Sequence, residues 1–165
     1  MDLLDRLIGH DRWTTERLLG YCQAMSPEEW GRNFRIGNGS LRATFEHVLL
    51  ARKSWVDLMT GTPGTWMQDE PLPPQPYDEL IERNRASSER LDVFARDMTA
   101  QGRLDDLFTD TWGVEHSFGA TILQVILHAH AHRAEILAML EASGIENLPD
   151  GDPQEWEWTI RLQGT

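Results

Sequence analysis

The stretch Leu127-His128-Ala129-His130-Ala131-His132-Arg133 lies inside an apolar run from Ala120 to Leu140, which we interpret as one long helix. An α-helix advances about 100° per residue, so His128 and His132 lie roughly 40° apart, one turn from each other, whereas His130 points to the far side. Two imidazoles at this spacing can bind one metal ion, as in helical zinc motifs. A half-exposed histidine cluster without a ligand is the alternative, and the spacing alone leaves both open.

Composition narrows the class of protein. The chain has 165 residues, of which 40% are hydrophobic, enough for a single domain spanning residues 1–165 with its own core. The net charge of -12 argues against nucleic acid or an anionic membrane as the main partner. A single cysteine, Cys22, excludes an internal disulfide, and neither a signal peptide nor an apolar run of membrane-spanning length is recognisable. We therefore expect a soluble cytoplasmic protein.

Apolar residues recur at helical spacing in four segments. Ser26-Pro27-Glu28-Glu29 is typical of a short helical turn, with serine as N-cap, and Ser40 is an equally good N-cap for the helix that follows. The four predicted long helices cover residues 2–25, 40–60, 77–101 and 119–143.

The segments between and after the predicted helices indicate how the helices are connected. Residues 62–76 hold five of the eight prolines and predict a long crossing from one end of a bundle to the other. Residues 104–118 predict a short hairpin or an extended segment before the last helix. The tail from Ile145 carries Trp156 and Trp158, which suggest that it folds back onto the body. We predict an all-α four-helix bundle with a Pro-rich crossover.

His47 lies within the second predicted helix. Small side chains one or two turns away on its helix leave room for an ion and a ligand: Ala43, Thr44, Ala51 and Ser54. Helix bundles build metal sites from inward side chains on facing helices. His47 together with His128 and His132 would supply such a site.

The sequence resembles the DinB/YfiT-like family of metalloenzymes over nearly its whole length. The first matching motif is Thr44-Phe45-Glu46-His47-Val48-Leu49, and the second runs from His128 to Ile136 with His132 and Arg133 inside it. Ala134 and Glu135 depart from the Gly and Gln that the family usually has there, and neither change removes a ligand.

The resemblance implies an up-down-down-up bundle, commonly a homodimer, that holds a divalent ion, with nickel or zinc expected and iron or manganese as further options. Relatives include thiol S-transferases that use bacillithiol, mycothiol or glutathione, a maleylpyruvate isomerase and some hydrolases. The family takes its name from DNA-damage induction, but the charge of this chain gives no support for DNA contact.

Three neutral imidazoles leave open positions on a divalent ion, as in catalytic sites. Our hypothesis is a thiol S-transferase, in which a thiol cosubstrate binds the ion as its thiolate and attacks an electrophile held against a tryptophan-rich wall. Side chains expected to bind this small-molecule substrate are Gln124, Thr121, Ser54 and Trp55. A metal-dependent hydrolase, or a non-enzymatic small-molecule-binding or stress-response bundle, stays open as an alternative.

Glu135 faces the same side as the histidine pair, and as the candidate catalytic acid or base it has several possible roles. It could orient an imidazole, act as a base or be a fourth ligand, or it could be a solvated helix-end acid. Were His47 to point elsewhere, His128, His132 and Glu135 could form a facial triad for iron.

The remaining histidines and the cysteine have plainer interpretations. His10 is expected to be a hydrogen-bonded core histidine, although it could approach the site, and His116 and His130 are read as surface or supporting residues. Cys22 is expected to be a small core residue, because no positive group that would activate a thiol is evident nearby.

Overall fold

The computed structural model describes residues 1–62 and 76–163. Helix α1 spans Leu3–Cys22, α2 spans Pro27–Trp30 and α3 spans Leu41–Met59. Both serines predicted as N-caps act as such: Ser26 Oγ accepts from the Glu29 N–H and Ser40 Oγ accepts from the Ala43 N–H. These bonds satisfy backbone donors that a helix start leaves open, which explains why the helices begin there.

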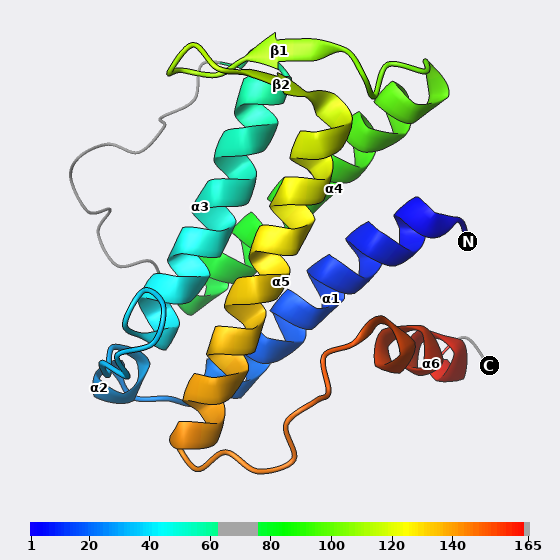
Figure 1. Cartoon of the computed structure of the whole chain (residues 1–165). Coiled ribbons are helices and arrows are strands. Elements are labelled where there is room, and N and C mark those ends of the chain that lie inside the picture. Colours follow the sequence, from blue (N-terminus) through cyan, green and yellow to red (C-terminus); the bar gives the residue numbers. More distant parts are fainter. Residues whose placement is uncertain (63–75, 164–165) are drawn as a thin grey trace.

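The long helices form the predicted all-α bundle. Helix α4 spans Tyr77–Ala100 and α5 spans Phe118–Ala142. Helices α1 and α3 each pack against both α4 and α5, so α1 and α3 lie diagonally opposite. Helices α3 and α4 run in one direction and α1 and α5 in the other, which is the up-down-down-up arrangement (Figure 1). The predicted Pro-rich crossing falls mostly on residues 63–75, outside the described residues.

The segment before α5 is a short hairpin. Strand β1 (Leu107–Thr109) pairs antiparallel with β2 (Glu115–Ser117), with Phe108 opposite His116. Ser117 Oγ accepts from the Ala120 N–H, so α5 begins at Phe118, one residue earlier than the sequence predicted. The hairpin lies at the end of the bundle where α3 ends and α5 begins (Figure 1).

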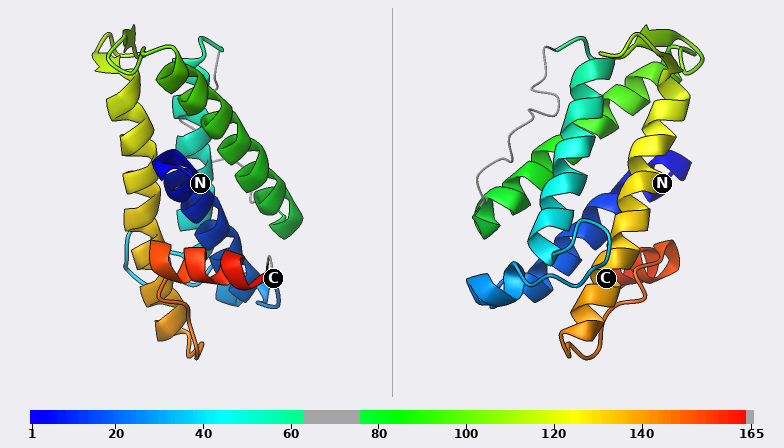
Figure 2. Two further views of the ribbon diagram at one scale, coloured as in Figure 1. Left: turned by 90° about the vertical axis from the view of Figure 1, so that its right-hand side faces the viewer. Right: turned by 60° about the vertical axis from the view of Figure 1, so that its left-hand side comes forward.

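The tail folds back, as expected, and forms a helix that the sequence reading did not predict. Helix α6 (Pro153–Gln163) packs against α1 (Figure 2). The Trp156 ring is buried against Gly9, where a Cβ would lie only 2.6 Å from Trp156 Cζ2. Trp158, by contrast, is 65% exposed, so only one of the two tail tryptophans docks.

Two apolar clusters make up the core. The first is built around Phe45, Leu80 and Ile136, and the second around Val56, Leu91 and Ile126. Each long helix also buries polar side chains, among them Asp11 of α1, Arg52 of α3, Asn84 of α4 and Arg133 of α5. In the parts of the chain that the structure describes, no helix is long and apolar enough to cross a membrane.

Candidate metal centre

The structure brings three histidine side chains together between α3 and α5. His128 Nε2 lies 3.1 Å from His47 Nε2 and 3.2 Å from His132 Nε2. The three potential ligand atoms all lie within 4.8 Å of one another, and the cluster is only partly buried. Histidines 81 residues apart in the sequence therefore share one site because α3 and α5 pack side by side.

Hydrogen bonding among the rings does not account for this arrangement. A neutral imidazole nitrogen carries either one N–H or one lone pair, and His128 Nε2 faces two other ring nitrogens. At most one of these contacts can be an ordinary N–H···N hydrogen bond. A cation accepts all three lone pairs, and nitrogens bound to a tetrahedral zinc ion would lie about 3.4 Å apart. The donor set thus fits a divalent metal ion.

The electrostatics favour the neutral form of two of the three rings, His47 and His128. Burial lowers the pKa of His128 to about 4, with further lowering by the neighbouring His132 and His47. Burial also lowers the pKa of His47, and the charge of His132 adds to the effect. At neutral pH both rings therefore keep lone pairs free for an ion, with little competition from protons.

Glu135 contacts the cluster from the outer side of His132. Its Oε2 lies 2.7 Å from His132 Nδ1, so the Nδ1–H donates to the carboxylate and Nε2 is left bare toward the other two rings. Of the roles left open by the sequence, this geometry corresponds to orienting the imidazole. His47 points toward the pair, so the arrangement is a three-histidine cluster rather than two histidines and a carboxylate.

The loop before α3 reaches this carboxylate, which the sequence reading missed. Gly37 has φ +48°, and a Cβ there would overlap the Glu135 carboxylate. Glycine is needed for both reasons, since it adopts positive φ without strain and leaves space for the acid. The Gly37-Asn38-Gly39 turn was the available signal, but a turn motif does not name what packs against it.

The four side chains expected to bind substrate lie at different depths. Ser54 and Thr121 are buried, and the Thr121 hydroxyl donates to the carbonyl of Ser117, the N-cap residue of α5 (2.9 Å). Trp55 packs edge-on against His116 of the hairpin, with ring centroids 5.6 Å apart, and Gln124 is exposed. Their role toward a substrate stays a prediction.

The other histidines and the cysteine lie apart from the three-histidine cluster. His10 is buried and its Nε2 donates to the Gly151 carbonyl (2.9 Å), as in a core histidine. His116 is paired with Asp110 (3.0 Å) in the hairpin, and His130 is exposed. Cys22 is buried, which raises the pKa of its thiol to about 12 and makes it unreactive.

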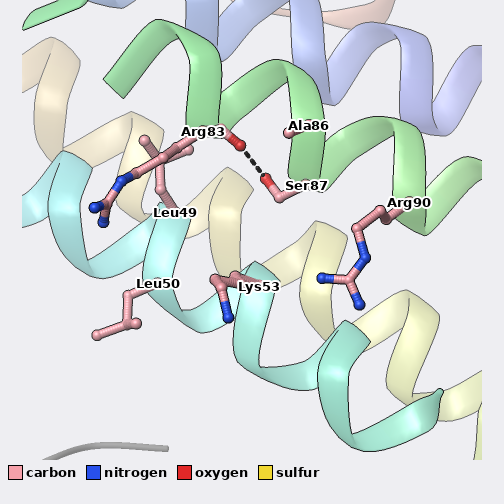
Figure 3. A pocket seen from close by; sticks show the side chains of 7 residues that line it. All are labelled: Leu49, Leu50, Lys53, Arg83, Ala86, Ser87 and Arg90. Carbon is pink, nitrogen blue, oxygen red and sulfur yellow. Dashed lines mark hydrogen bonds between the residues drawn. The ribbon is translucent and has the colours of Figure 1, made fainter. Parts of the chain in front are cut away.

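A pocket of about 150 Å³ lies elsewhere, between α3 and α4 (Figure 3). Its three cations are engaged: Lys53 and Arg90 form ion pairs with Asp57, and Arg83 pairs with Glu79. Ser87 donates to the Arg83 carbonyl (2.7 Å). With all three of its cations engaged in ion pairs and no histidine in its wall, this pocket offers less chemistry than the cluster between α3 and α5.

Comparisons with known proteins agree with this architecture. A crystal structure assigned to the DinB family, from Exiguobacterium sibiricum 255-15, matches 90% of this chain and 95% of its own, with a TM-score of 0.61 and 20% identity. At that identity the likeness shows the fold alone. No curated protein matches the chain. The sequence model of the DinB family matches residues 2–163, and the protein therefore belongs to the DinB family.

Proposed function

We propose that the protein is a divalent-metal-dependent enzyme of the thiol S-transferase type, which adds a low-molecular-weight thiol to an electrophile. The observation that carries this proposal is the convergence of three ring nitrogens within 4.8 Å in a partly exposed position. Nickel or zinc suits such a set of imidazoles, with iron or manganese as further options.

The residues of the chain have separate tasks. His47, His128 and His132 hold the ion through neutral imidazoles, and Glu135 fixes the direction of His132 through its Nδ1–H. The excess of 27 acidic over 15 basic residues favours a cation at the protein surface. When bound, the ion supplies Lewis acidity that lowers the pKa of a thiol or of water.

An addition reaction balances without a further reactant. The thiol loses its proton to solvent, its sulfur forms a C–S bond with the electrophilic carbon, and the displaced electron pair takes up a proton. Hydrolysis at the same centre would gain from a carboxylate base, but the Glu135 carboxylate is occupied by His132 Nδ1. This contact is our reason for ranking the transferase above the hydrolase.

The test is metal content and activity with a panel of thiols. Protein purified without a tag is expected to contain about one divalent ion per chain and to conjugate a model electrophile with bacillithiol, mycothiol or glutathione. His47→Ala should lose both properties, whereas His130→Ala, on the exposed side of α5, should keep them. Activity that persists in metal-free protein would exclude the proposal, and bound metal without any thiol reaction would favour a non-enzymatic binding role.

A homodimer and a cytoplasmic location also belong to this proposal. The family resemblance motivates the first, and the single cysteine motivates the second. Light scattering coupled to size-exclusion chromatography tests the dimer, and a mass equal to the 18.9 kDa chain would exclude it.

A further inference from the structure

A buried ion network crosses the middle of the bundle, close to the histidine cluster. Asp11 on α1 is fully buried, and its two carboxylate oxygens bind different guanidinium groups. Oδ2 accepts from Arg52 Nη2 of α3 (2.6 Å), and Oδ1 accepts from Arg133 Nη1 of α5. One carboxylate thus joins the helix that carries His47 to the helix that carries His128 and His132.

The two arginines lie close in the sequence to the histidines that are proposed to bind the metal ion. Arg133 directly follows His132, and Arg52 lies five residues after His47, about 7.5 Å further along α3. Viewed along the helix axis, each arginine is rotated about 100–140° from its neighbouring histidine, and it points toward α1. The histidines therefore lie on one side of the α3–α5 contact and the arginines on the other.

The network has one anion for two cations. Among the described residues, Arg52 and Arg133 form ion pairs with Asp11 alone. Arg52 is held further by Asn84 Oδ1 (2.8 Å) and Ser88 Oγ (2.7 Å) of α4. Arg133 is held less well, since its Nε and Nη2 have no partner in the described part of the chain and Thr15 Oγ1 lies 3.3 Å from Nη1. Asp11 is consequently the main group that fixes Arg133.

We propose that Asp11 is a positioning residue of the metal centre: its shared carboxylate sets the spacing of α3 and α5 at which His47 meets His128 and His132. This inference rests on the proposed metal site. When a buried charge loses its partner, the surrounding structure must move or admit water to solvate that charge. The two arginines would then separate and carry α3 and α5 with them.

Asp11→Asn tests the idea, with Co²⁺ as the probe and the full chain as the protein. Asparagine keeps the size and the acceptor oxygen but removes the charge. We expect the Co²⁺ dissociation constant to rise about 10–100-fold, the range found when groups that support metal ligands are lost. We also expect the visible absorption bands of the bound Co²⁺ to shift, which a general loss of stability would not cause.

Asp57→Asn is the matched control. Asp57 is equally buried and also joins two cations, Lys53 (2.5 Å) and Arg90 (2.6 Å), but these lie on α3 and α4 and not on α5. We expect this variant to lose thermal stability as Asp11→Asn does, while its Co²⁺ affinity and spectrum stay as in the wild type.

The outcomes separate the inference from the proposed function. A wild-type chain that does not bind Co²⁺ would overturn the metal site itself. A wild-type chain that binds, with Asp11→Asn binding equally well, would overturn only the role of Asp11. Should Asp11→Asn fail to give a helical circular dichroism spectrum, Asp11→Glu decides, since it keeps the charge and moves it by one methylene. Severalfold weaker binding by that variant supports the proposal, and unchanged binding overturns it.

Discussion

At the scale of single residues, the Glu135 carboxylate is the group next to the cluster whose contribution can be separated most cleanly. Because it accepts from His132 Nδ1, removing it frees the imidazole to rotate or to change tautomer. We expect Glu135→Ala to weaken metal binding about 10–100-fold and Glu135→Gln to retain most of the affinity, since the amide oxygen can still accept. Competition with a chromophoric chelator measures both. Glu141→Ala removes the same charge from an exposed site on α5, and an equal loss there would attribute the effect to charge alone.

The depressed pKa of His128 predicts how the metal-free protein responds to acid. The pKa of His128 is about 6.5 in the unfolded chain and about 4 in the folded chain. Between these two pH values the unfolded chain therefore binds more protons than the folded one. Lowering the pH therefore favours unfolding. The contribution of His128 is complete above about pH 6.5, is lost progressively below it, and levels off under about pH 4.

Melting temperatures of metal-free protein between pH 7 and 4 measure this dependence. His128→Gln should fall less steeply than the wild type over the range, because it removes one depressed group. His130→Gln, at an exposed position, should follow the wild type. Parallel curves for His128→Gln and the wild type would show that His128 is not held neutral by its surroundings.

At the scale of elements, the loop before α3 acts on the metal centre through Gly37. Alanine at a left-handed position costs about 1–2 kcal/mol, and its Cβ would also push the Glu135 carboxylate aside. We expect Gly37→Ala to lower stability only by this conformational amount, because the carboxylate can rotate away, but to weaken metal binding as Glu135→Ala does. Gly102→Ala is the control, since its φ of +67° is similar and nothing lies within 4 Å of the added Cβ. Urea denaturation and chelator competition give the two quantities, and unchanged metal affinity in Gly37→Ala would separate the loop from the site.

The helices also show how much of the structure the sequence could predict. Apolar periodicity and the serine caps gave the four long helices, and the His-x-x-x-His spacing selected the pair on α5. Helix α6 was missed because Trp156, which packs against Gly9, is its one buried side chain among the described residues, and a single buried residue makes no periodic pattern.

The buried Asp11, Arg52 and Arg133 were missed for a different reason. Charged residues on an inner stripe count against burial in any pattern of hydrophobicity, and only the packed bundle shows that they form ion pairs with one another. The contact of Gly37 with Glu135 likewise joins distant parts of the chain, so it becomes visible only in three dimensions.

For the whole molecule, a metal ion held by α3 and α5 should stabilise the folded bundle. The ion binds the folded state, whereas the unfolded chain has no assembled site for it. At a free concentration 100 times the dissociation constant, such binding stabilises the fold by about 2.7 kcal/mol. For a chain of 165 residues this corresponds to a rise in melting temperature of roughly 5–10 °C. Differential scanning fluorimetry with Ni²⁺ or Zn²⁺ measures the rise. His47→Ala, which removes the only contribution of α3 to the described cluster, should show little of it, since the two remaining histidines lie on one helix and neither hold the ion tightly nor join α3 to α5. An equal rise in His47→Ala would mean that the ion binds elsewhere and that the packing of α3 against α5 does not depend on it.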